Sequence, residues 1–108
     1  MRIGRLDDGG VTRLTLHGEL DLDTGDLVEE QVTGALRDRP ESLVLDLEGL
    51  TFCDSAGIDV LLLSREAVRR AGARFRVTRP RGIVLRSLEV TGLLEILTSD
   101  REPAGGRP

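Results

Sequence analysis

A short apolar segment near the middle of the chain, Leu43-Val44-Leu45-Asp46-Leu47, constrains the fold most strongly. Its apolar residues occupy neighbouring as well as alternate positions, which is the pattern of a strand that is buried on both faces. Strands of this kind lie in the centre of sheets that are covered by helices. The segment therefore predicts an α/β domain.

Two extended segments joined by a tight turn precede this central strand. Residues 2–6 and 11–18 flank Asp7-Asp8-Gly9-Gly10, and an Asp-Gly-Gly run between extended segments is typical of a hairpin. In the second segment, residues suited to a core alternate with more polar residues, which predicts a half-buried strand. Its buried face is expected to carry Thr12, Leu14 and Leu16.

Helical spacing of apolar residues marks three further segments. The first helix is expected to begin after Asp23 or Thr24 and to end before Pro40. Its apolar stripe is predicted to contain Leu27, Val28, Gln31, Val32, Ala35 and Leu36. The second and third helices are predicted at residues 55–72 and 82–90, the third with Ile83, Val84 and Leu88 inward.

Two more strands are predicted at residues 74–78 and 93–97, and residues 48–54 are interpreted as a loop. The element order is then β-β-α-β-α-β-α-β, which predicts a mixed β-sheet covered by helices. We expect one domain over residues 1–97. Residues 98–108 are polar, contain Gly105-Gly106 and two prolines, and are expected to form a disordered tail.

Charge and aromatic content argue against a nucleic-acid partner. The net charge is −4, all 15 positive residues are arginine, and Phe52 and Phe75 are the two aromatic residues of the chain. An acidic balance does not suit a phosphate backbone, and the stacking platforms used by single strands are missing. We therefore expect the chain to bind no nucleic acid.

Cys53, the single cysteine, cannot form an internal disulfide, which fits a reducing cytoplasm. The sequence has neither the pattern of a signal peptide nor an apolar run long enough for a membrane span. We therefore expect a cytoplasmic protein without a membrane partner. Cys53 itself is interpreted as a small core residue.

An acidic cluster around the start of the first helix raises the question of metal binding. A calcium loop would begin at Asp21-x-Asp23-x-Gly25, but Val32 stands where that loop needs a bidentate glutamate. Acidic residues at a helix start more simply complement the helix dipole. We expect no metal and no cofactor in this chain.

The segment Asp54-Ser55-Ala56-Gly57 follows the central strand and opens the second helix. Ser55 is expected at the N-cap or in the first turn, where a phosphate would meet free backbone N–H groups and the positive end of the helix dipole. The small residues after it would let a partner approach closely. From helix chemistry alone, an ordinary capping pair is the simpler interpretation of Asp54-Ser55, and the functional interpretation needs more than this loop.

Several motifs together resemble anti-sigma factor antagonists of the STAS domain family. Asp54-Ser55-Ala56-Gly57, preceded by Leu45-Asp46-Leu47 and Leu50-Thr51-Phe52, is similar to that family's signature segment. Residues 18–24, Gly-Glu-Leu-Asp-Leu-Asp-Thr, are similar to its second marked segment, and residues 86–93 to its third helix. The resemblance extends over residues 1–97, although the family's final amphipathic helix is short or absent here.

This resemblance implies a binding protein that is not an enzyme. It would bind an anti-sigma factor with serine kinase activity and so release a sigma factor, until the kinase phosphorylates Ser55 and a phosphatase reverses the modification. ATP and magnesium would belong to the kinase, and a homodimer is left open. The resemblance places partner binding on Asp21, Asp23, Thr24, Asp54, Ser55, Ala56, Gly57 and Ile58.

Three alternatives remain. The chain could be a STAS-like scaffold or an accessory subunit of a signalling or lipid-transport assembly, with Ser55 unmodified. A serine nucleophile at Ser55 would need a base, for which His17 is the single histidine. A phospho-aspartate receiver with Asp46 or Asp54 as acceptor would need a lysine, and the chain contains none.

Overall fold

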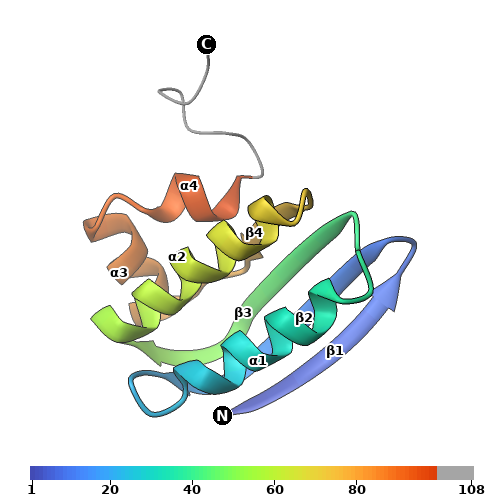
Figure 1. Cartoon of the computed structure of the whole chain (residues 1–108). Helices are drawn as coiled ribbons and strands as arrows, with labels where there is room; N and C mark the ends of the chain where they lie inside the picture. Colours follow the sequence, from blue (N-terminus) through green and yellow to red (C-terminus); the bar gives the residue numbers. More distant parts are fainter. Residues whose placement is uncertain (100–108) are drawn as a thin grey trace.

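The computed structural model describes residues 1–99, which form four strands and four helices (Figure 1). The elements along the chain are β1 Arg2–Asp8, β2 Val11–Leu20, α1 Gly25–Leu36, β3 Ser42–Cys53, α2 Ser55–Arg70, β4 Arg74–Thr78, α3 Gly82–Val90 and α4 Leu94–Thr98. Within this described part of the chain, no helix is both long and apolar enough to cross a membrane.

The sheet is mixed, as predicted, with the strand order β1-β2-β3-β4. β1 pairs antiparallel with β2, while β2, β3 and β4 run parallel to one another. A two-residue turn joins β1 to β2, because Asp8 pairs directly with Val11. Gly9 and Gly10 have φ values of 57° and 86°, which is the backbone of a hairpin turn that glycine adopts without strain. The predicted hairpin is confirmed.

α1 and α2 pack against each other over one face of the sheet (Figure 1). The inward face of the sheet carries Leu14, Leu16, Leu43, Leu45, Leu47, Phe75 and Val77, all 2% exposed or less. Val28, Val32 and Ala35 of α1 and Leu61 and Val68 of α2 complete this core. The register places Arg13, Val44 and Arg76 side by side on the opposite face.

The central strand is longer than predicted. Residues 48–53, expected to form a loop, continue β3 because their pairing with β2 extends to Leu20 opposite Cys53. The register shifts between Thr15 and His17 and again between Gly18 and Glu19. Such bulges interrupt the simple alternation of buried and exposed residues, so the pattern of residues 48–53 does not show that they form a strand.

The last predicted strand, at residues 93–97, is wrong. The segment forms the short helix α4, in which the N–H of Leu97 donates to the carbonyl of Leu93. Leu97 is fully buried, and α4 lies against β4. Leu-Leu-Glu-Ile-Leu shows no alternation and consists mostly of good helix formers. Thr98, assigned to the tail, ends α4, whereas residues 100–108 of that predicted tail lie outside the described residues.

Three residues of the predicted apolar stripes face outward, among them Gln31 of α1. Leu27 is 44% exposed and Ile83 is 59% exposed. In α1 the buried residues Val28, Val32 and Ala35 follow a spacing of four and three, which makes a narrow stripe that leaves Leu27 on its flank. The sequence pattern could not distinguish the flank of the stripe from its centre.

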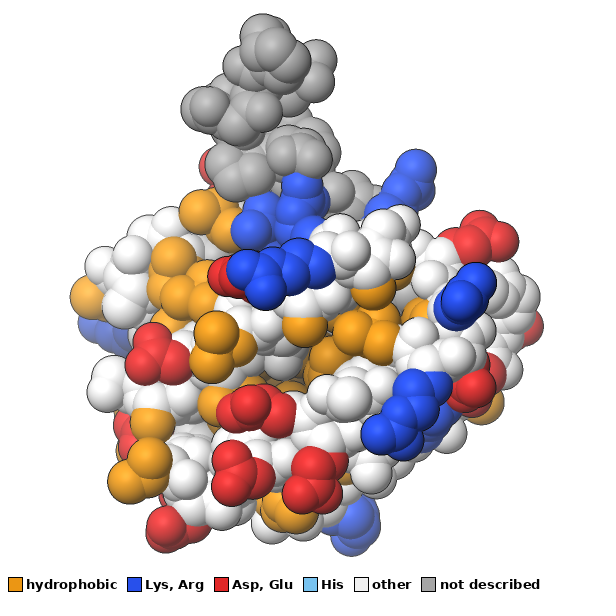
Figure 2. All heavy atoms as spheres, in the orientation of Figure 1, with side chains coloured by type: hydrophobic (Ala, Val, Ile, Leu, Met, Phe, Trp, Pro, Cys, Tyr) orange, Lys and Arg blue, Asp and Glu red, His pale blue; other side chains and the backbone are white. Residues whose placement is uncertain are grey.

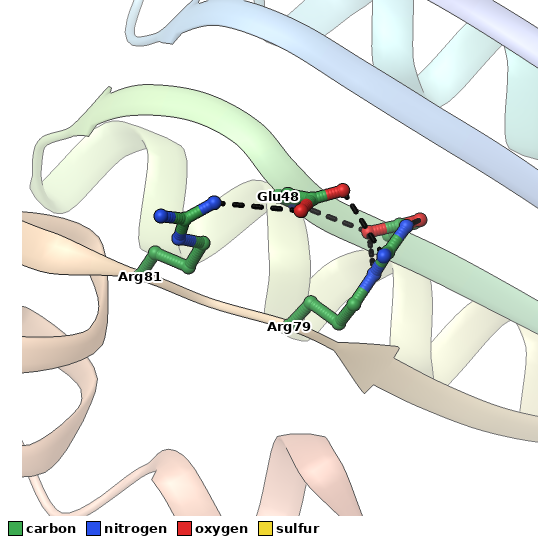
Figure 3. A network of polar contacts seen from close by, with 4 residues as sticks. Glu48, Arg79 and Arg81 are labelled. Carbon is green, nitrogen blue, oxygen red and sulfur yellow. Dashed lines mark hydrogen bonds and ion pairs between the residues drawn. The ribbon is translucent and has the colours of Figure 1, made fainter.

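An ion pair between the buried Asp46 and the half-exposed Arg79 fixes the connection between β4 and α3 (Figure 3). Asp46 of β3 is 2% exposed. Arg79, just after β4, donates to its carboxylate from Nε at 3.2 Å and from Nη2 at 2.5 Å. The backbone of Arg79 has a φ of 54°, a left-handed conformation that is costly for a residue with a side chain. The bidentate bond therefore holds a strained turn in place.

The same network determines how Asp46 responds to pH. Burial alone would raise the pKa of the Asp46 carboxyl, but hydrogen bonds from Arg79 and from the backbone N–H of Glu48, with the charges of Arg79 and Arg13, hold it below its ordinary value. A lowered pKa contributes stability that is complete above the pKa of the unfolded chain, about 4. That contribution is lost as the pH falls towards the lower pKa of the folded state.

We expect Asp46→Asn to destabilise the fold by about 1–3 kcal/mol at neutral pH, because it removes a buried charge-assisted hydrogen bond. In urea unfolding, the free energy of unfolding of Asp46→Asn should fall less on acidification than that of the unchanged protein. Glu48→Gln is the matched control, because Glu48 is 46% exposed, and it should cost less than about 0.5 kcal/mol. Equal losses in the two variants would contradict this assignment.

Candidate functional site

The site predicted around Ser55 forms where β2 and β3 end together. Leu20, the last residue of β2, pairs with Cys53, the last residue of β3. The backbone N–H of Asp54 donates to the carbonyl of Leu20 at 3.3 Å. The loop of residues 21–24, which leads into α1, therefore lies beside the start of α2. The structure thus brings together the two segments that sequence similarity singled out.

Asp54 is the N-cap of α2. Its Oδ1 accepts a hydrogen bond from the backbone N–H of Gly57 at 2.9 Å, and its carbonyl accepts from Ile58 at 2.9 Å. Ser55 is the first residue of the helix and is exposed. Because Asp54 supplies the cap, the capping explanation accounts for Asp54 but not for the hydroxyl of Ser55.

The loop before α1 is held by its own side chains. Asp21 accepts hydrogen bonds from the backbone N–H groups of Asp23 and Thr24 at 3.0 and 3.1 Å. The hydroxyl of Thr24 donates to the carbonyl of Glu19 at 2.8 Å and accepts from the N–H of Asp21 at 3.0 Å. Asp21 and Thr24 therefore maintain the loop, while the exposed Asp23 is presented to solvent.

Gly57 has a structural role that the sequence did not show. It is buried, and a Cβ atom at this position would lie 2.5 Å from the carbonyl oxygen of Leu20 and 2.8 Å from Sγ of Cys53. The expectation that Gly57 leaves space for an approaching partner is therefore wrong. Its missing side chain lets α2 begin directly against the end of β2. Ala56 and Ile58, on either side, are partly exposed.

Cys53 is 6% exposed, which confirms its interpretation as a core residue. Burial, helped by the negative charge of Asp54, raises the pKa of the Cys53 thiol to about 11. A thiol with this pKa stays protonated at neutral pH, and the thiolate is the reactive form. Cys53 therefore fills space under the site rather than reacting there.

The residues behind the alternative hypotheses have structural roles. His17 is exposed on β2 and packs over Gly49, where an added Cβ atom would collide with the imidazole ring. Asp46, a possible receiver aspartate, is buried under Arg79 and is not part of an open acidic pocket. Its partner Arg79 was missed in the sequence, because the two residues are 33 positions apart.

Two exposed apolar residues beside the site were also missed. Leu22, in the loop of residues 21–24, is 82% exposed, and Phe52, next to Cys53, is 39% exposed. A leucine between two aspartates in a short loop was the available signal for Leu22. Acidic side chains gather over α1 (Figure 2), where Asp26, Glu29 and Glu30 line a shallow hollow. The two segments around Ser55 therefore expose a hydroxyl, the apolar side chains of Leu22 and Phe52 and the carboxylate of Asp23, while the acidic hollow lies along α1.

Comparisons with known proteins agree with this geometry. Residues 6–103 match the model of the STAS domain. The chain is 36% identical over 89 residues to the anti-sigma F factor antagonist of Paenibacillus polymyxa, covering 82% of this chain and 76% of that protein. It is 31% identical over 87 residues to the anti-sigma-F factor antagonist RsfB of Mycobacterium tuberculosis, covering 81% and 70%. The chain therefore belongs to the STAS domain family.

Solved structures show the same fold. An anti-sigma factor antagonist from Mycobacterium paratuberculosis superposes with a TM-score of 0.77 at 28% identity, covering 89% of this chain and 81% of that one. Unphosphorylated SpoIIAA, an anti-sigma factor antagonist, superposes with a TM-score of 0.75 at 18% identity, covering 96% and 91%. The predicted mixed sheet with its helices is confirmed as a STAS fold.

We expect Gly57→Ala to destabilise the protein by about 1–3 kcal/mol, because the added methyl group cannot fit without moving backbone. The matched control is Gly34→Ala in α1, where a Cβ atom would meet nothing within 4 Å. That substitution should stabilise the protein by about 0.5–1 kcal/mol through helix propensity. Thermal or urea unfolding of both variants tests this pair of opposite signs. A neutral Gly57→Ala would contradict the close approach of Leu20.

Proposed function

We propose that this protein is an anti-sigma factor antagonist whose docking surface is switched off by phosphorylation of Ser55. The observation that carries the proposal is the exposed position of Ser55 as the first residue of α2. The first N–H groups of a helix lack intrahelical acceptors. Asp54 accepts from the N–H of Gly57, so the N–H groups of Ser55 and Ala56 are left at the helix start to face a phosphate.

A phosphate at Ser55 changes the surface more than the fold. It adds a charge of about −1.5 to −2 at pH 7, beside Asp54 and on the same surface as Asp23. The positive end of the helix dipole favours that charge. A partner packed on Leu22 or Phe52 would have to strip water from the dianion, which is costly in an apolar contact. Phosphorylation is therefore expected to weaken docking while the domain stays folded.

The names of related proteins and the fold of solved structures support this proposal. The curated relatives in Paenibacillus polymyxa and Mycobacterium tuberculosis are both named anti-sigma F factor antagonists. SpoIIAA has been solved in an unphosphorylated and a phosphorylated form, and both superpose on this chain, with TM-scores of 0.75 and 0.69. A phosphorylated state is thus compatible with the fold in that protein.

The partners follow from this function. An anti-sigma factor with serine kinase activity would bind the surface formed by the loop of residues 21–24 and the first turn of α2, and would release its sigma factor. ATP and magnesium would be bound by the kinase. A phosphatase that acts on phosphorylated Ser55 would restore docking. The protein would act in the cytoplasm, by binding rather than by catalysis. If Ser55 is never modified, the protein is instead a scaffold subunit of a larger assembly.

We expect Ser55→Ala to bind the anti-sigma partner as tightly as the unmodified chain does and to be insensitive to ATP. Ser55→Asp should bind about tenfold more weakly or worse, because it introduces a charge into the docking surface. Calorimetric titration of the purified anti-sigma factor with each variant makes the comparison.

The matched control is Ser55→Asn, which has nearly the size of aspartate without its charge and should bind close to the level of Ser55→Ala. Circular dichroism should show all three variants folded. Equal affinity of the alanine and aspartate variants would refute the charge switch, and loss of binding in the asparagine variant would attribute the effect to size.

A further inference from the structure

β1 is an edge strand with a free side. Within residues 1–99 it pairs with β2 alone, because β2 separates it from β3 and β4. All its residues other than Ile3 are exposed, and Leu6 is 63% exposed. An open strand edge presents unpaired backbone groups that can add another strand.

The hairpin register shows which backbone groups are free. In a two-residue turn the carbonyl of the first flanking residue accepts from the N–H of the second, here Asp8 and Val11. Hydrogen-bonded and non-hydrogen-bonded pairs then alternate along an antiparallel ladder. The N–H and C=O groups of Ile3, Arg5 and Asp7 therefore point away from β2, towards the open edge.

The charges of β1 suit pairing with a second, antiparallel copy of the same strand. The strand reads Arg-Ile-Gly-Arg-Leu-Asp-Asp, with a positive residue at its start and negative residues at its end. If a second copy runs antiparallel about an axis at Arg5, Arg2 of each copy lies opposite Asp8 of the other. Charges on an edge strand usually block pairing, but here the facing charges are opposite in sign, which stabilises a cross-strand pair.

The side chains between these charged ends also fit. In the same register Leu6 of one copy lies opposite Gly4 of the other, on the sheet face shared with Arg2 and Asp8. Gly4 has no side chain, and a Cβ atom there would lie 2.7 Å from Oγ1 of Thr15. The exposed Leu6 would therefore cover the backbone of the second copy at a position where no side chain obstructs it.

Arg5 is the residue that would meet its own copy at the axis. In each copy its guanidinium is already bound to Asp7 at 3.0 Å and to Asp38 at 2.6 Å. These two carboxylates compensate its charge and hold its side chain, which is 29% exposed, on the face that α1 covers. The backbone of Arg5 stays available for pairing.

We infer that β1 is a self-pairing edge, through which two copies of this protein join their four-stranded sheets into one continuous sheet about a two-fold axis. The inference does not rest on Ser55, because it uses β1 and its neighbour β2. It also leaves the first turn of α2, which follows β3, outside the paired edge.

Sedimentation equilibrium of the full chain from micromolar to millimolar concentration tests this inference. We expect a monomer–dimer equilibrium. Arg2→Asp and Asp8→Arg should each weaken it by about tenfold, because two attractive pairs become repulsive. The double variant Arg2→Asp/Asp8→Arg restores opposite charges across the axis and should return the affinity to near its original value. Arg86→Asp, an exposed change on α3, is the control and should have no effect.

Amide hydrogen exchange locates the interface. The N–H groups of Ile3, Arg5 and Asp7 should exchange rapidly in dilute solution and become protected as the concentration rises. A protein that stays monomeric at millimolar concentration would overturn the inference. A dimer that is unaffected by the single charge reversals, or that protects other amides, would do the same. Binding of the Ser55 variants to the anti-sigma factor is measured separately, so the two proposals can fail independently.

Discussion

The close approach of the Leu20 carbonyl to the first turn of α2 is the contact on which the rest of the site depends. It requires a glycine at residue 57, since a Cβ atom there would lie 2.5 Å from that oxygen. It also joins the loop before α1 to the helix start through the hydrogen bond from Asp54. Ser55 is presented at the surface because the residues on both sides of it are held in this way.

The residues around the site divide into those that maintain the backbone and those that meet solvent. Asp21, Thr24 and Asp54 use their side chains to satisfy backbone N–H or C=O groups. Leu22, Asp23 and Ser55 are exposed beside them. The backbone of the site is thus held by its own side chains, and only a few groups meet solvent. Charge added to one of these groups acts on docking and not on folding. Such a surface suits a protein whose affinity for a partner is changed by a single modification.

Most of the fold could be predicted from local pattern. The hairpin followed from Gly9-Gly10, the buried faces of β2 and β4 from alternation, and the start of α2 from Asp54-Ser55. The second half of β3 and the helix α4 could not be predicted. Bulges opposite His17 and Gly18 disturb the alternation of β3, and α4 is defined by Leu97 packing into a core that local sequence does not reveal.

The candidate site was also predicted only in part. Motif similarity identified the two segments that the structure brings together. The burial of Gly57 and the Asp46–Arg79 pair could not be predicted, because they depend on contacts between residues that are distant in the sequence.

The central claim is that a phosphate on Ser55 alters the surface and spares the fold. The most direct measurement is a pair of amide nitrogen–proton correlation spectra of the protein before and after stoichiometric phosphorylation of Ser55. The account predicts that resonance shifts are confined to residues 21–24 and 54–58, with the signals of β3 and of the rest of α2 unchanged. Shifts spread through the core strands, or a loss of signal dispersion, would show that the phosphate acts by disrupting the fold and would contradict the account.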